Sequence, residues 1–258
     1  MRRIVGFAGF VLMLLCLCGC VSNEELYEVD ISADELEARK DKAMDPDGRY
    51  ARAESCIVRQ RITSENFFGI PQESMVELKF QNPDKFSLTS FSENMPVSAL
   101  ISDGTSAWKV DYKRRQVLPL NQRDLEISRG LARLANPLSR LHEVFEDIKV
   151  EGCRIDDEEF YKLTCIAPNN GIPIYIYIDR DDYLIKRIRI GNLSDSRVVR
   201  YSMYEGVWIA DETEEEKLSD GSISRSKIMF YKLDAPFEES EFKPPIFNTG
   251  VQDSEETN

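Results

Sequence analysis

The fold is decided by residues 86–120, which read FSLTSFSENMPVSALISDGTSAWKVDYKRRQVLPL. Apolar and polar residues alternate over Phe86–Leu88 and again over Trp108–Tyr112, which is the period of a half-buried strand. The Asp-Gly pair at 103–104 is a strong hairpin signal, and residues 113–115 suit a second, solvated turn. The stretch therefore predicts short strands joined by tight turns.

The same alternation continues on both sides of this stretch. Before it, one strand carries Cys56, Val58 and Ile62 on one side, and a second strand passes through Leu78 and Phe80. After it, further strands are expected at Glu151–Ile155, Phe160–Ala167, Ile172–Asp179, Leu184–Gly191, Arg197–Tyr204, Val207–Lys217 and Ser222–Leu233. This is a curved antiparallel meander, long enough to form a barrel or most of one.

Residues 121–149 have a different pattern, because their leucines recur at mostly helical spacings. Asn136-Pro137 interrupts the run, which predicts two helices, at about 124–135 and about 138–148. We expect these helices to cover the open face of the sheet.

The N-terminus indicates export. Met1-Arg2-Arg3 is a basic start, followed by an apolar run too short to span a bilayer comfortably, so residues 1–19 have the form of a secretory signal. Its end, residues 17–20, resembles the bacterial lipobox, which implies lipidation of Cys20. An ordinary signal peptide or an uncleaved anchor is the alternative. In lipoprotein sorting an Asp after the acylated Cys retains the protein in the inner membrane. Val21 stands there instead, which implies the outer membrane, facing the periplasm.

The formal net charge is −13, and removal of the signal would also take away Arg2 and Arg3. So acidic a chain is repelled by nucleic acid and by anionic lipid surfaces. We therefore expect no nucleic-acid partner. Membrane attachment must come from acyl chains, and from more than one, since a single chain binds only marginally.

After Cys20 the remaining cysteines are Cys56, Cys153 and Cys165. The last two flank an acidic turn, and an exported protein meets an oxidising compartment, so a Cys153–Cys165 disulfide is predicted. The alternative is two reduced, buried thiols that behave as small apolar residues. Cys56 is expected to be unpaired and buried.

Residues 20–49 form an acidic linker with a possible helix. Ser32 with Glu35 is a capping box, and the helix it would start ends near Met44. The helix could pack loosely on the domain or act as a spacer, and a spacer with one loosely packed face is favoured. Residues 247–258 are polar and acidic, and disorder is predicted there.

The loop at 66–71 is unusually apolar and contains Phe67, Phe68 and Ile70. Most such loops fold back as a minor core. The other hypothesis is a tip that contacts a membrane or a ligand.

The sequence offers little for catalysis. His142 is the single histidine, set in a predicted helix, and no nucleophile elbow, phosphate loop or histidine-rich metal spacing is present. The carboxylates of residues 179–182 suit a solvated turn better than a calcium loop. We expect no enzyme activity, no metal site and no cofactor.

One family resemblance is carried by short motifs. Residues 99–104, followed by residues 108–112, resemble the "DG" turn and Trp-containing strand of LolA/LolB-like proteins. The helical interruption, the strand ending at residues 206–209 and the closing residues 242–245 match in order. The likeness covers about residues 50–246. LolB has a protruding apolar loop between its third and fourth strands, where this chain has residues 92–96 with Met95 the one large apolar tip.

The resemblance implies an incomplete antiparallel barrel, mainly β with a helical lid, of about 11 strands. Its hydrophobic cavity would hold the acyl chains of lipids or lipoproteins, and a periplasmic carrier protein is a possible partner. Alternating positions predict the cavity lining: Val58, Leu78, Phe80, Leu88, Trp108, Val110, Ile174, Ile176, Ile188 and Ile190. The first interpretation is thus a lipid-anchored carrier or acceptor. The second is a structural or interaction lipoprotein whose barrel is filled by its own side chains.

Overall fold

The computed structural model describes residues 24–65, 70–122, 124–125, 128, 140–145, 147–166 and 171–247. Its helical elements over these ranges are α2 (Ala33–Met44), α4 (Leu141–Val144) and the 3-10 turns η2 (Tyr50–Arg52) and η3 (Glu239–Phe242). The strands are β1 (Glu25–Tyr27), β2 (Ser55–Glu65), β3 (Pro71–Gln81), β4 (Lys85–Ser92), β5 (Met95–Asp103), β6 (Ala107–Asp111), β7 (Gln116–Pro119), β8 (Ile148–Ile155), β9 (Glu158–Ile166), β10 (Pro173–Asp179), β11 (Ile185–Ile190), β12 (Ser194–Tyr204), β13 (Val207–Lys217) and β14 (Ser222–Leu233).

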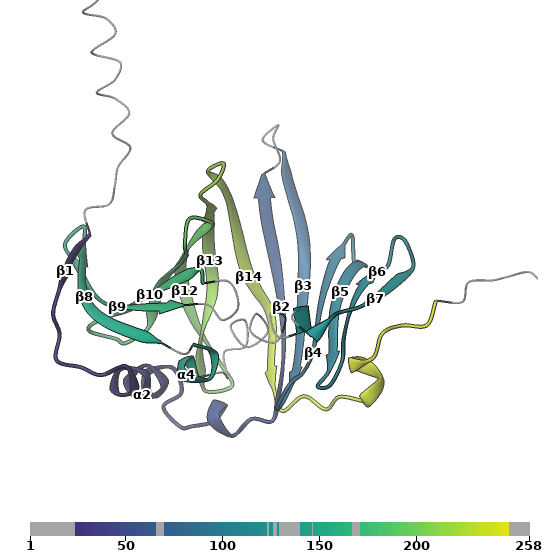
Figure 1. Ribbon diagram of the computed structural model, residues 1–258, viewed down its shortest axis with the longest axis horizontal. Helices are drawn as coiled ribbons and strands as arrows, with labels where there is room; N and C mark the ends of the chain where they lie inside the picture. The colour runs from purple at the N-terminus through teal and green to yellow at the C-terminus, as the bar shows by residue number, and fades with distance from the viewer. Residues whose placement is uncertain are drawn as a thin grey trace, which may run out of the picture.

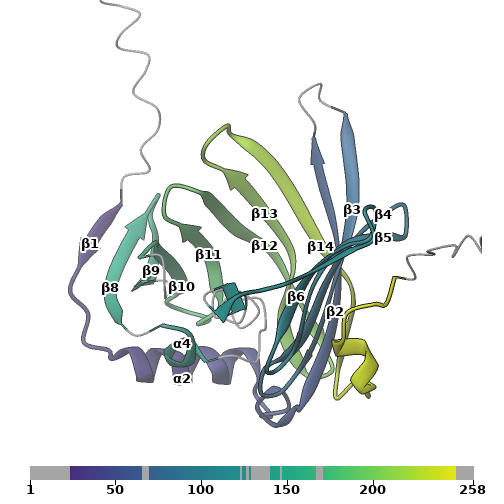
Figure 2. The same cartoon turned by 45° about the vertical axis from the view of Figure 1, so that its right-hand side comes forward.

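The strands of the described ranges form one antiparallel sheet of 14 strands, in the order β1-β8-β9-β10-β11-β12-β13-β14-β2-β3-β4-β5-β6-β7. Strands that are neighbours in the sheet are also consecutive in the sequence, with two exceptions: β14 pairs with β2, and β1 pairs with β8. Because β1 and β7 are the two edges, the sheet curves without closing (Figures 1 and 2). The mainly β, incomplete-barrel prediction is confirmed, but the described residues form 14 strands where about 11 were predicted. One of the additional strands is β1, which comes from the predicted linker.

The stretch at 86–120 forms β4 to β7, joined by the turns that its sequence predicts. Gly104 has a φ of 92°, a left-handed conformation that glycine adopts without steric cost. The Asp103 carboxylate accepts hydrogen bonds from the backbone N–H groups of Thr105 and Ser106, at 2.9 and 2.8 Å. Residues 112–115 make the turn between β6 and β7. These local bonds fix where each strand ends.

The two faces of the sheet are distinguished by what covers them. Residues directly opposite each other in an antiparallel ladder share a face. The register carries one face across β8 to β12 through Val150, Leu163, Ile176, Ile188 and Ser196. We call this the inner face, because Leu36 of α2 and Leu141 of α4 join its buried cluster. The opposite side is the outer face.

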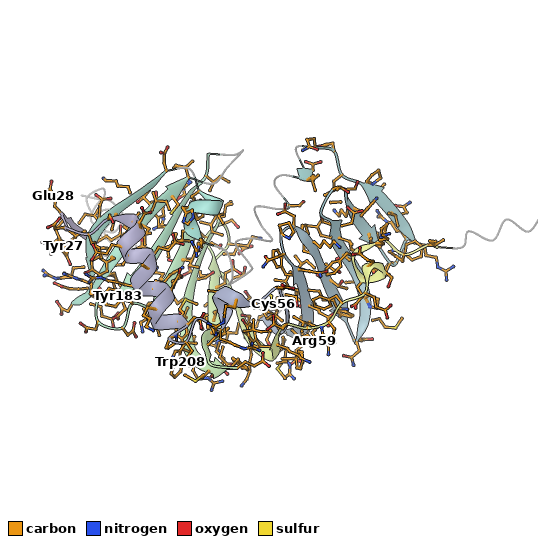
Figure 3. All side chains as sticks on the ribbon, turned by 90° about the horizontal axis from the view of Figure 1, so that it is seen from below. Tyr27, Glu28, Cys56, Arg59, Tyr183 and Trp208 are labelled. Atoms are coloured by element: carbon orange, nitrogen blue, oxygen red, sulfur yellow. The ribbon has the colours of Figure 1, made fainter. Side chains whose placement is uncertain are left out.

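Helix α2 is part of the folded domain. Ser32 is its N-cap and accepts a hydrogen bond from the backbone N–H of Glu35 at 3.2 Å, as the sequence predicts. The Leu36 side chain is 0 % exposed and lies in the inner cluster. Figure 3 shows α2 crossing the strands beside Tyr183, whose hydroxyl accepts a hydrogen bond from Arg39 at 2.6 Å. The favoured spacer interpretation is therefore wrong, because a helix with so deeply buried a side chain is packed on the sheet.

The lid helices predicted at about 124–148 are described only in part. Residues 126–127, 129–139 and 146 lie outside the described residues. Helix α4 ends at Val144, and Ile148 is already the first residue of β8, paired with Cys165. The predicted second helix is thus too long at its C-terminal end, because Ile148 and Val150 continue the strand alternation. No helix within the described ranges is long and apolar enough to cross a membrane.

The chain termini cover parts of the outer face. Glu24 forms an ion pair with Lys162 at 2.6 Å, just before β1. At the other end, Phe242 of η3 is fully buried, and Lys79 of β3 pairs with Glu241 at 2.6 Å. Residues 1–19, Cys20 and residues 248–258, for which a signal, lipidation and disorder are predicted, lie outside the described residues.

Candidate functional site: a groove on the inner face

A groove of about 450 Å³ lies between the inner face of the sheet and the two helices. Its floor comes from β10 to β14 and β2, and its roof includes Lys40 and Met44 of α2 with Leu141 and Val144 of α4. The volume falls within the range of about 300–1,000 Å³ that small-molecule sites occupy. We call this space the inner groove.

The part of the inner groove under the helices is apolar. Ile176 is buried, and Ile188 packs against the same cluster, which includes Leu141 and Val144. On β13 and β14 the apolar floor continues with Ile209, Ile228 and Tyr231. Ile228 and Tyr231 are three positions apart, and a β-bulge between Ile228 and Phe230 places both on this face. The surface suits an acyl chain, which needs contact without hydrogen bonding.

The remainder of the floor is polar. The groove is also lined by Gln60, Ser196, Thr213, Glu215, Ser224 and Ser226. The Thr213 and Ser226 hydroxyl oxygens are hydrogen-bonded to each other at 2.7 Å. The inner groove is thus apolar toward the helices and hydroxyl-rich toward the β13–β14 turn.

Tyr231 lines the groove with an unsatisfied polar atom. Its side chain is buried, and its hydroxyl has no hydrogen-bond partner among the residues that the structure describes. Burial raises the pKa of this phenol above its ordinary value, so the hydroxyl keeps its proton. Within the described ranges this hydroxyl is therefore buried in the floor of the groove, out of contact with solvent, without a hydrogen-bond partner.

The roof is fastened by a buried carboxylate. Glu37 of α2 is 6 % exposed and accepts a hydrogen bond from the backbone N–H of Leu141, the first residue of α4. The same carboxylate lies 3.0 Å from Nδ1 of His142. The single histidine is thus placed in a contact between the two helices of the roof.

Eight of the ten predicted lining residues lie on the inner face. Val58, Ile176 and Ile188 line the inner groove itself. The other five lie elsewhere on that face: Ile174 and Ile190 in the cluster beneath the helices, Leu78, Phe80 and Leu88 in the cluster with Val58.

Trp108 and Val110 are on the wrong face for this role. Trp108 is opposite Ile101, and Val110 is opposite Ala99, whereas the inner-face Leu88 is opposite Leu100. Both side chains pack in an outer-face cluster together with Phe247. An alternating sequence shows that Trp108 and Val110 share a face, but it does not show which face of the sheet that is. The register between β5 and β6 decides this.

The predicted disulfide is also wrong. Cys153 is opposite Phe160, whereas Cys165 is opposite Ile148, so the two thiols lie at different rungs. They also lie on opposite faces, in separate clusters, and no disulfide joins the three described cysteines, all of which are buried. Burial raises the thiol pKa to about 12 for Cys56 and Cys165 and to about 11 for Cys153.

The sequence interpretation missed the hydroxyl side of the groove. Ser224, Ser226 and Ile228 alternate along β14, a pattern that could have placed both serines on the same face as the isoleucine. Phe67 and Phe68 lie outside the described residues, and Ile70, the third residue of the predicted contact loop, is 57 % exposed.

Comparison with known proteins gives matches at the level of structure. No family model matches the chain, and no curated protein matches it. A LolA superfamily protein from Nitrosomonas europaea is 14% identical, covers 83% of this chain and 99% of its own, and has a TM-score of 0.58. A putative outer membrane lipoprotein-sorting protein domain from Vibrio parahaemolyticus is 13% identical, with 81% and 94% coverage and a TM-score of 0.54.

A DUF1329 family protein from Desulfovibrio piger is 12% identical, covers 81% of this chain and 94% of its own, and has a TM-score of 0.54. At sequence identities this low, the matches are evidence about the fold alone. The fold they indicate agrees with the resemblance carried by the motifs at residues 99–112. The chain therefore has a LolA-like fold.

Proposed function

We propose that this chain is a lipid-anchored envelope protein that binds acyl chains, of lipids or of lipoproteins, in the inner groove. It acts as a carrier or acceptor in their transport to the outer membrane, without enzyme activity. The observation that carries the proposal is a groove of about 450 Å³ whose floor under the helices is apolar. A barrel filled by its own side chains would leave no such space.

The anchor is the lipid on Cys20, and the lipobox-like residues 17–20 support this part of the proposal. The position of β1 bears on which end of the domain would face the membrane. The start of β1 lies at the same end of the sheet as the end of β2 and the start of β3 (Figures 1 and 2). An anchor a few residues before Glu24 would hold this end toward the membrane. Ile70 of the predicted contact loop directly precedes β3 and is 57 % exposed, so we propose that this loop, with Phe67 and Phe68, contacts lipid.

Native mass spectrometry of the mature chain carrying Cys20→Ser, purified without detergent, tests ligand binding. The protein is expected to retain lipid, and Ile188→Trp is expected to reduce the lipid-bound fraction by filling the groove. Met203→Trp is the matched control, because Met203 is 53 % exposed on a neighbouring strand and does not line the groove.

A lipid-free wild-type protein would contradict the proposal and favour the structural-lipoprotein alternative. The anchor is tested separately by cell fractionation. The Cys20→Ser chain should leave the outer-membrane fraction, and normal retention of a cleaved mutant would refute lipidation at Cys20.

A further inference from the structure

A rung of facing residues crosses the inner face and changes character within the groove. Its polar half, from β3 to β12, consists of Gln72, Ser64, Ser224, Glu215 and Ser196. Its apolar half, from β11 to β8, consists of Ile188, Ile176, Leu163 and Val150. The change falls between Ser196 and Ile188, and both side chains line the groove. We call the polar half, with Thr213 and Ser226 on the next rung, the polar band.

The polar band does not serve an acyl chain. A hydroxyl that loses water without gaining a hydrogen bond costs about 1–3 kcal/mol. Thr213 and Ser226 satisfy one hydrogen bond between themselves, and each hydroxyl keeps further capacity to donate or accept. A groove for chains alone would be expected to carry apolar residues at these inward positions. The band instead provides hydrogen-bonding groups for a polar part of the ligand.

The charge of the band indicates the kind of head that fits. Glu215 lies in the band and has no ion pair among the described residues, whereas the adjacent Glu214 pairs with Arg225 at 2.9 Å. Two cations also line the groove: Lys40 in the roof pairs with Asp41 at 2.9 Å, and Arg197 is opposite Arg187 and Glu214, at an outer-face position. Glu215 is at an inner-face position of the band, and its carboxylate repels an anionic head.

We propose that the ligand of the inner groove is an amphiphile with an uncharged, hydrogen-bonding head, such as a glycerol ester. Its chain lies under α2 and α4, its head contacts the polar band, and Glu215 disfavours anionic amphiphiles such as free fatty acids. The inference rests on the proposed acyl-chain binding and adds the class of head group.

The test compares 1-decanoylglycerol with decanoate, which share one chain and differ in the head. Binding to the mature chain carrying Cys20→Ser is measured by calorimetry at pH 7.5. Glu215→Gln should raise the decanoate affinity about threefold to fivefold, the effect of one exposed charge pair, and change decanoylglycerol binding little. Glu214→Gln is the matched control, because the neighbouring side chain points to the outer face.

The hydroxyls are tested by Ser224→Ala with Ser226→Ala, which should weaken decanoylglycerol about fivefold and leave binding of decane unchanged. Unfolding temperatures identify any variant that is simply destabilised. If both ligands bind and Glu215→Gln acts no differently from Glu214→Gln, the head-group inference is overturned while acyl-chain binding stands. If neither ligand binds to the wild-type chain, the proposed function fails as well.

Discussion

The burial of Leu36 makes a quantitative prediction about α2. Its side chain is 0 % exposed and contacts the cluster beneath the helices. Leu→Ala at a fully buried site typically costs about 2–5 kcal/mol, from lost burial and the cavity that remains. Alanine has the higher helix propensity, so the helix itself is not weakened and the loss must come from packing. For a domain of this size the expected fall in unfolding temperature is about 2–4 °C per kcal/mol, or about 4–20 °C.

The assay is thermal and urea unfolding of the mature chain with Leu36→Ala. Leu26→Ala is the control, because Leu26 is a leucine of the same N-terminal segment and is 46 % exposed. Its effect should stay within about 0.5 kcal/mol. If the two variants unfold alike, α2 is not packed on the sheet, and the roof of the inner groove is misplaced.

Three other outcomes are expected. Alkylation in denaturant without reductant should modify both Cys153 and Cys165. A protein mass that lacks both alkyl adducts would show instead that the two cysteines form a disulfide. Burial works to raise the pKa of Asp211, but hydrogen bonds from Tyr204 and Arg200 hold it below 3.8, so its stabilising contribution should be complete above that pH and decline as the pH falls through the lowered pKa. Asp211→Asn should therefore be destabilising at neutral pH, and its gap to wild type should narrow as the pH is lowered below 3.8, whereas a gap that does not change with pH would contradict this. Phe67→Ser with Phe68→Ser should keep the unfolding temperature and lose liposome binding, and a much lower temperature would show that the loop is core.

Local signals predict the strands well because strand period and turn chemistry act over a few residues. The turn at Asp103-Gly104 and the alternation at Ile174 and Ile176 are where the sequence places them. The errors concern contacts across the sheet. Trp108 and Val110 alternate as expected but face outward, because register with β5 is a long-range property.

The remaining errors have the same origin. Cys153 and Cys165 flank one hairpin, yet the position of the β8–β9 turn puts them on opposite faces. Helix α2 has few apolar residues, and no sequence average shows that Leu36 is fully buried together with Glu37 and Lys40. Ser224 and Ser226 look like an ordinary solvated face until the register sets them opposite Glu215 and Thr213 in the groove.

The central claim is that acyl chains occupy the inner groove, and photo-crosslinking in living cells tests it most directly. A photoreactive diazirine analogue of leucine, similar in size to isoleucine, at position 188 lies in the groove without filling it, and the same analogue at Met203 lies on the exposed surface. After irradiation, mass spectrometry should find lipid adducts at position 188 and few at position 203. Equal labelling at both positions, or none at 188 in a correctly folded chain, would contradict the claim.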